Sequence, residues 1–183
     1  MFQLLFFIFY QMSIQLVTLK ETFFSSIVKW KKDEELADLI MAKTSENTES
    51  EVAEWVNNNN SDPDQRIWGI YSNDLDKPIG IARLMFINWE AGTTELGLYF
   101  GEVDARGKGY GKKVINLLLQ KAFDELNLKK VFLKVLSSNI PAMKLYEKMG
   151  FEIEGVLKKH HFVKNQLHDV IYMSFFKENY ESE

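Results

Sequence analysis

The chain has 183 residues, 46% of them hydrophobic, and a formal net charge of −4. This length and apolar content suffice for one domain with a buried core, and the acidic balance argues against a general nucleic-acid-binding protein. The absence of cysteine excludes disulfides, thiolate catalysis and zinc ribbons, and agrees with the cytoplasmic location that we expect.

The N-terminal residues differ in composition from the rest. Residues 1–11 are almost wholly apolar, but they lack the basic start and cleavage site of a signal peptide and are too few to cross a bilayer. We therefore expect Met12 to be the true start and residues 12–183 to form a single domain. A membrane-surface anchor is the alternative, but the apolar run carries no cationic face, so we expect no membrane partner.

The first half of the chain is predicted to hold one strand, three helices and a hairpin. In chain order these are a strand at 14–19, helices at 23–31, 33–41 and around 52–56, and a hairpin formed by 67–71 and 79–87. Residues 57–64 combine four asparagines with serine, aspartate and proline, which favour turns. We therefore expect these residues to form an exposed loop.

The second half is predicted to alternate strands and helices before a terminal hairpin. The expected elements are a strand at 93–100, a helix at 109–126, a strand at 131–136, a helix from Asn139 to Gly150 and a hairpin at 157–173. The helix between the two strands is long enough for a crossover, which implies that they pair in parallel. Asn139 is suited to cap its helix, and Pro141 falls in the first turn.

The segment Arg-Gly-Lys-Gly-Tyr-Gly-Lys-Lys, residues 106–113, lies between the predicted strand and helix. Its three glycines let the backbone approach a ligand closely, and the helix that follows attracts anions at its N-terminus. The segment therefore predicts a phosphate-binding cradle. A Walker loop is excluded because Arg106 replaces its first glycine and Lys113 its serine or threonine, and the dinucleotide motif is excluded by the third glycine interval.

The pattern Arg-x-x-Gly-x-Gly at 106–111, followed by residues 139–151, resembles the Gcn5-related N-acetyltransferases, the GNAT family. The resemblance runs from about residue 14 to 180 and is strongest for the branch of amino-sugar, polyamine and ribosomal-protein acetyltransferases, whose terminal hairpin is similar to 157–173. It implies an α/β (α+β) fold, with a mixed, mostly antiparallel sheet of about seven strands, a splayed central parallel pair and helices on both faces.

The resemblance also implies acetyl-CoA as acetyl donor. Its diphosphate is expected at the cradle and its thioester arm beside the end of the preceding strand. The expected contact residues are Tyr99, Phe100, Arg106, Gly107, Lys108, Gly109, Tyr110, Gly111, Lys112, Asn139 and Tyr146. Residues 101–105 depart from the family pattern because they lack its usual proline and are one residue longer, which leaves the register of individual contacts open.

Two residues are candidates for proton transfer. By the resemblance, Tyr146 is the general acid for the leaving thiolate; spacing alone also fits a core aromatic. Glu95 is the candidate base that takes a proton from the acceptor amine through water, because it points away from the apolar side chains of its strand. A carboxylate in such surroundings should either resist ionisation or have a partner, so a structural ion pair is the alternative.

The three histidines lack carboxylates at the spacing of metal ligands on a helix, so we expect no metal site. His161 and His168, or Trp30 and Trp68, are candidates to contact the acceptor, although solvated or core positions explain them as well. The predicted reaction is direct transfer to a small primary amine, first a nucleotide-linked amino sugar and second a polyamine. Acetylation of a protein N-terminus and a non-catalytic acetyl-CoA sensor are the alternatives, and a homodimer is possible.

Overall fold

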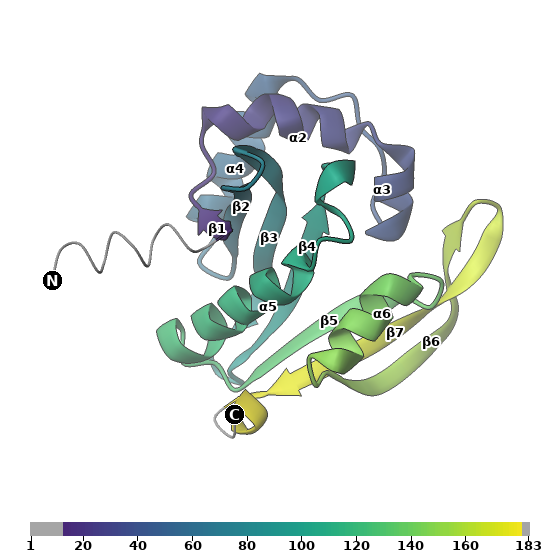
Figure 1. The fold of residues 1–183 in the computed structure, drawn as a ribbon. Coiled ribbons are helices and arrows are strands. Elements are labelled where there is room, and N and C mark those ends of the chain that lie inside the picture. Colours follow the sequence, from purple (N-terminus) through teal and green to yellow (C-terminus); the bar gives the residue numbers. More distant parts are fainter. Residues whose placement is uncertain (1–12, 181–183) are drawn as a thin grey trace, which may run out of the picture.

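A seven-stranded sheet organises residues 13–180, the part of the chain that this computed structural model describes. Its spatial order is β1-β2-β3-β4-β5-β7-β6 (Figure 1). The strands are β1 (Ile14–Val17), β2 (Arg66–Ser72), β3 (Lys77–Asn88), β4 (Thr93–Phe100), β5 (Lys130–Leu136), β6 (Glu152–Val163) and β7 (Gln166–Phe176). β4 and β5 are parallel and all other neighbours are antiparallel, which confirms the predicted sheet.

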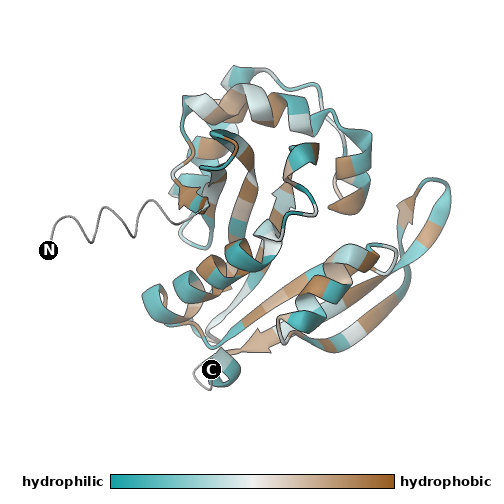
Figure 2. Cartoon of the chain, in the orientation of Figure 1, coloured by the Kyte–Doolittle hydropathy of each residue, from teal (hydrophilic) through white to brown (hydrophobic). Residues whose placement is uncertain are grey.

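Helices connect the strands and cover both faces of the sheet. They are η1 (Glu21–Phe23), α2 (Phe24–Lys31), α3 (Glu34–Leu39), α4 (Glu49–Ser61), η2 (Val103–Ala105), α5 (Tyr110–Gln120), the π-helical turn η3 (Lys121–Glu125), α6 (Ile140–Lys148) and α7 (Lys177–Tyr180). α2 and α5 each mix hydrophobic and hydrophilic residues along their length, as amphipathic helices do (Figure 2). Among residues 13–180, no helix is both long and apolar enough to cross a membrane.

Two hydrophobic clusters occupy opposite faces of the sheet. Ile81 packs with residues of α2 and α4, whereas its neighbour Ala82 packs with residues of α5 and with Tyr146 of α6. Successive side chains of a strand point to opposite faces, so the two clusters lie on either side of β3. The face towards α2 and α4 is called the α2 face below, and the other the α5 face.

The central parallel pair separates part-way along its length. β4 and β5 pair only from Thr93 to Glu95, opposite Lys130 to Phe132. β5 keeps its antiparallel ladder with β7 as far as Leu136, and β4 keeps its ladder with β3 as far as Phe100. The two strands therefore splay beyond Glu95 and Phe132, and the main-chain edge of β4 that faces β5 is left unpaired by it.

The predicted exposed loop at 57–64 is wrong for residues 57–61, because α4 continues to Ser61; only residues 62–64 lie outside the helix, in a turn. Asn59 is buried within this helix; its Nδ2 donates to the Trp55 carbonyl at 2.7 Å, and its Oδ1 accepts from Arg83 Nη2 at 2.8 Å. The bond within the helix and the tertiary contact with Arg83 outweigh the weak helix propensity of asparagine. The predicted helix at 109–126 is α-helical only to Gln120 and continues as η3.

The expectations about residues 1–11 lie outside the described residues. The boundary of the single domain at Met12 therefore stays a prediction, as does the possible homodimer. From β1 to α7, however, the described chain contributes its strands to one continuous sheet.

Candidate active site

The predicted cradle lies where β4 ends and α5 begins. Gly107 and Gly109 have φ angles of +72° and +76°, and a Cβ atom at either position would meet nothing within 4 Å. The backbone conformation, not lack of space, is therefore what requires glycine there. Gly109 is the residue before α5, and no described side chain caps this helix. The first amides of α5 are thus oriented for an anion.

Gly111 has a different role from the other two glycines. A Cβ atom at this position would lie 2.6 Å from Leu145 Cδ2 of α6. The first turn of α5 therefore packs closely against α6, and the two helices meet on the α5 face of the splayed strands. Gly111 serves this packing, whereas Gly107 and Gly109 shape the cradle.

The basic residues of the cradle divide into exposed and engaged side chains. Lys108 and Lys112 are exposed beside the start of α5. The Nε of Arg106 donates to the Phe100 carbonyl at 3.3 Å, and its Nη2 lies 3.9 Å from an Asp33 carboxylate oxygen. Arg106 therefore braces the segment between β4 and α5, and the lysines supply the accessible positive charge.

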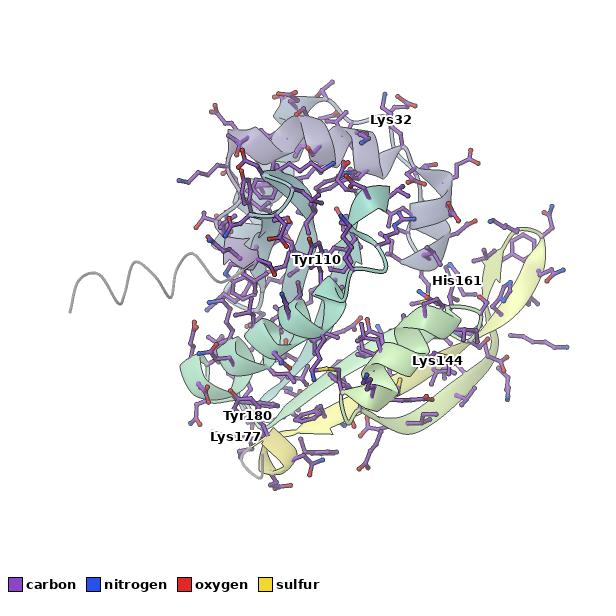
Figure 3. All side chains as sticks on the ribbon, in the orientation of Figure 1. Lys32, Tyr110, Lys144, His161, Lys177 and Tyr180 are labelled. Carbon is purple, nitrogen blue, oxygen red and sulfur yellow. The ribbon has the colours of Figure 1, made fainter. Side chains whose placement is uncertain are left out.

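Tyr110 turns its side chain away from a ligand at the cradle. Its ring is buried, and its hydroxyl donates to the Asp74 carboxylate at 3.0 Å (Figure 3 labels Tyr110 at the start of α5). A contact between Tyr110 and a diphosphate would therefore involve the main-chain N–H. A similar argument applies to Asn139, whose Oδ1 accepts from the Ala142 N–H at 3.3 Å and caps α6 as predicted.

Tyr99 and Phe100 form the end of β4 expected to accompany the thioester arm. The Tyr99 ring packs edge-on against Trp30 with centroids 6.1 Å apart, and burial raises the pKa of this phenol. Phe100 packs against the cluster on the α5 face. With their side chains engaged in packing, these residues have only their main chain to offer an extended ligand. Trp30 is buried among the residues of α2 and α4 and also lines a pocket with Gly101 and Glu102, whereas Trp68 packs, partly buried, on the α5 face. Contact of either tryptophan with the acceptor stays a prediction.

Glu95 is the last residue of β4 that pairs with β5, and it lies on the α2 face, opposite to Leu96. Its carboxylate forms an ion pair with Lys134 Nζ at 2.8 Å, and the side chain is only 12% exposed. Burial lowers the pKa of Lys134, but the hydrogen bonds and charge interactions with Glu95 and Tyr172 together outweigh burial, and the net shift is upward. The ion-pair alternative is thus what the ligand-free chain shows, and the role of base stays a prediction.

Tyr146 is buried on the α5 face, with its ring 5.7 Å from that of Phe151. Burial raises the pKa of its phenol to about 12. The hydroxyl therefore keeps its proton at neutral pH, as a general acid must. This pKa is above the usual thiol value of about 8.5, so proton transfer to the leaving thiolate is uphill by itself and needs a second proton to return to the tyrosinate.

The histidines lie on the terminal hairpin. His161 faces His168 across the β6–β7 ladder, and His160 is exposed (Figure 3 labels His161). Within residues 13–180, no group of three or more histidine or acidic side chains is arranged to hold a metal ion. Contact between a histidine and the acceptor stays a prediction.

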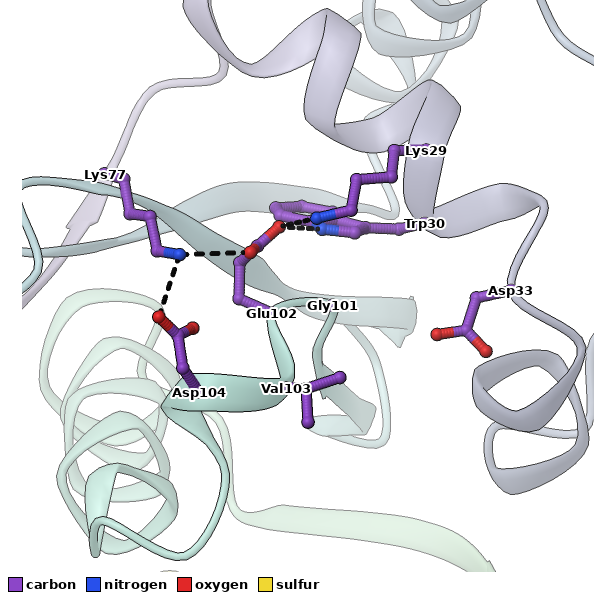
Figure 4. Close-up of a pocket in the computed structure, with 8 residues that line it drawn as sticks. All are labelled: Lys29, Trp30, Asp33, Lys77, Gly101, Glu102, Val103 and Asp104. Carbon is purple, nitrogen blue, oxygen red and sulfur yellow. Dashed lines mark hydrogen bonds and ion pairs between the residues drawn. The ribbon is translucent and has the colours of Figure 1, made fainter.

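Glu102 is a residue that the sequence did not single out. Its carboxylate accepts from Lys29 Nζ at 2.9 Å, Trp30 Nε1 at 2.8 Å and Lys77 Nζ at 3.1 Å, and Lys77 also pairs with Asp104 (Figure 4). Burial acts to raise its pKa, but the three donors outweigh burial and hold it at about 2. Glu102 thereby fastens α2 and β3 to the segment that leads into the cradle.

A model of the acetyltransferase (GNAT) family matches residues 25–151, more than half of the chain. The chain belongs to the GNAT family. Members of this family use acetyl-CoA as acetyl donor, in accord with the uncapped helix end and the splayed strands. The seven-stranded fold is therefore that of a GNAT domain.

The chain is similar to named members of the GNAT family in sequence and in structure. An uncharacterised N-acetyltransferase, p20, from Bacillus licheniformis is 31% identical over 113 residues, 62% of this chain and 63% of the relative. Spermidine N(1)-acetyltransferase from Vibrio cholerae is 33% identical over 102 residues, 56% of this chain and 58% of the relative. Both matches thus span less than two thirds of the relatives.

The structural likeness extends further along the chain. Spermidine N-acetyltransferase from Vibrio cholerae, solved in complex with CoA and spermine, superimposes with a TM-score of 0.85 at 25% identity. This superposition covers 92% of the present chain and 98% of the neighbour. The shared fold therefore includes the N-terminal helices and the terminal hairpin, which the sequence matches cover only in part.

Proposed function

We propose that this protein transfers the acetyl group of acetyl-CoA to a primary amine of a polyamine, by direct attack in a ternary complex. The observation that carries the proposal is the splay of β4 from β5, directly before the uncapped N-terminus of α5. A slot within the sheet beside an anion-binding helix end suits a donor with an extended arm and a diphosphate.

The choice of acceptor reverses the order that the sequence suggested. A nucleotide-linked amino sugar was expected first and a polyamine second, but both the Vibrio cholerae relative and the structural neighbour are named for spermidine. The seven-stranded fold matches that neighbour over nearly its whole length. A polyamine is therefore the first acceptor to test.

The proposed reaction uses the two residues singled out above. The acceptor ammonium loses one proton through water to Glu95, and the free amine then attacks the thioester carbonyl. The C–N bond forms and the C–S bond breaks as the tetrahedral intermediate collapses. Tyr146 donates its proton to the leaving thiolate, and the second nitrogen proton returns through solvent to the tyrosinate.

A thiol-release assay with a panel of amines tests this proposal. We expect acetyl-CoA to release its thiol fastest with spermidine or spermine, and more slowly with a nucleotide-linked amino sugar or a peptide with a free N-terminus. Isothermal titration of coenzyme A is the companion measurement. Tight binding of coenzyme A without thiol release for any amine would contradict the proposal and identify a sensor.

A further inference from the structure

The Lys134 ammonium lies in a site with the chemistry of an ammonium receptor. Its Nζ is 2.8 Å from the Glu95 carboxylate, and it lies 5.6 Å from the centroid of the Tyr172 ring and 6.0 Å from that of the Phe86 ring. A carboxylate combined with aromatic ring faces binds ammonium groups through charge and the ring quadrupole. Three different strands, β3, β4 and β7, supply these groups, so the site is assembled by the fold.

Phe86 lies in an irregular part of β3, and its ring is one of the aromatic groups around Lys134. Phe86 has a φ angle of +51°, and the β3–β4 register shifts between Met85 and Asn88. A bulky residue in the left-handed region is strained, and bulges re-aim side chains next to functional sites. The bulge leaves the Phe86 ring 66% exposed, with Lys134 over it. The ring is thus exposed on the surface beside the last residues of β4 that still pair with β5.

The position of the site relates it to the proposed reaction. Glu95 is the last residue of β4 that pairs with β5, and its partner there is Phe132. Lys134 lies on β5 two residues beyond Phe132. The ammonium of Lys134 therefore bridges the two strands where they begin to separate. An acceptor ammonium that passes its proton to Glu95, even through one water, has to displace Lys134 from this carboxylate.

We propose that the Lys134 ammonium stands in for the acceptor, and that Glu95, Phe86 and Tyr172 form the binding site for the reacting ammonium of a polyamine. Lys134 is then a positioning residue that keeps the site closed until a cationic acceptor displaces it. This inference rests on the proposed function, because it names how the same site recognises its acceptor.

Lys130 is a matched control on the same strand. Its Nζ pairs with Glu154 and lies 5.3 Å from the centroid of the Phe176 ring, so it too has a carboxylate and an aromatic neighbour. Its partner belongs to β6, away from the splay, and its side chain is 24% exposed against 32% for Lys134. A general effect of polyamines on lysine reactivity would change both residues alike.

The first test labels the lysines of the wild-type protein with an acetylating reagent, without acetyl-CoA, and quantifies the peptides by mass spectrometry. Saturating spermidine should raise the ratio of Lys134 to Lys130 labelling, because displaced Lys134 becomes exposed. 1,4-Butanediol, which has no ammonium, should leave the ratio unchanged. A ratio unaffected by spermidine, or an equal response to the diol, would overturn the inference.

The second test measures kinetics. Lys134→Met should lower the KM for spermidine about twofold to fivefold, the range expected for removing a partly exposed competing ion pair, whereas Lys130→Met should not change it. An unchanged or higher KM would support a purely structural ion pair. If the wild type acetylates no amine, the proposed function fails, while the labelling ratio still reports whether spermidine enters the site.

Discussion

At the scale of single residues, Tyr146 is buried, and burial raises the pKa of its phenol to about 12, so that the phenol keeps its proton. Tyr146→Phe should therefore lower kcat about 100-fold, the lower end of general-acid contributions, because only the donated proton is lost. Thiol release under saturating acetyl-CoA and amine measures this effect. Coenzyme A affinity, determined by titration calorimetry, should change less than about twofold, since the ring still fills its place.

A loss of coenzyme A affinity as large as the loss of kcat would show instead that Tyr146 acts in binding. An unchanged kcat in the variant would show that Tyr146 is only a core aromatic residue and not the general acid. Thermal unfolding of the two proteins provides the control, because both should melt at nearly the same temperature.

Gly109 carries the second residue-scale prediction. Alanine is strained at its φ of +76°, by about 1–2 kcal/mol, although the space for a methyl group is open. Gly109→Ala should therefore either lower the free energy of unfolding by that amount or shift the cradle and weaken coenzyme A binding about tenfold. Chemical denaturation and calorimetry measure the two outcomes.

Gly155→Ala is the control for Gly109→Ala. Gly155 also has nothing within 4 Å of a built Cβ, but it lies in β6 and its φ is not positive. This substitution should leave stability and coenzyme A affinity nearly unchanged. Equal behaviour of the two variants would mean that the left-handed backbone at Gly109 has no special role.

Strand alternation and capping preference predicted the positions of side chains better than their contacts. Strand alternation alone placed Glu95 on the face opposite to Leu96, and Asn139 could be recognised as a cap. The partner of Glu95 could not, because it depends on the register between β4 and β5, which are separated by a whole helix. The three donors around Glu102 were missed for the same reason, since they come from α2 and β3.

At the scale of elements, Glu102 joins α2 and β3 to the start of the cradle, and its contribution depends on pH. Its pKa is about 2 in the folded protein and 4.5 ordinarily, so the stabilisation is complete above pH 4.5 and is lost as the pH falls towards 2. Glu102→Gln should cost about 1–3 kcal/mol of unfolding free energy at pH 6. The difference between wild type and variant should shrink steadily below pH 4.5.

Denaturant unfolding at a series of pH values measures this difference. Glu90→Gln provides the control, because Glu90 is exposed, and it should match the wild type at each pH. A difference between wild type and Glu102→Gln that stays constant from pH 6 to pH 3 would contradict the assignment of the low pKa to Glu102.

Local sequence patterns predicted whether a segment is a helix or a strand better than they predicted where the helix or strand ends. The Thr48–Glu51 capping box marks the start of α4 and is visible in the sequence, but the end of this helix is not. The propensities of the asparagine-rich segment 57–64 predict a loop, whereas the hydrogen bond between Asn59 and Arg83 stabilises the helix there. That contact joins residues 24 positions apart and cannot be read from a local window.

At the scale of the whole molecule, binding of coenzyme A should stabilise the fold, because the ligand joins the two halves that diverge beyond Glu95 and Phe132. At 100 times its Kd, a ligand adds about 2.7 kcal/mol to the free energy of unfolding. For a domain of this size, that corresponds to an increase in Tm of about 5–10 °C. Differential scanning fluorimetry measures the shift, pantothenate serves as control, and an unchanged Tm with coenzyme A would count against the proposed site.

The early end of the β4–β5 ladder has a further thermodynamic consequence. Peptide groups along the open edge of β4 need hydrogen-bond partners, and in the free protein solvent fills that need. Binding of the acetyl-CoA arm along this edge would release the hydration water and bury apolar side chains beside it. Calorimetry at several temperatures should therefore give a negative heat-capacity change of binding, with a reaction that becomes more exothermic on warming.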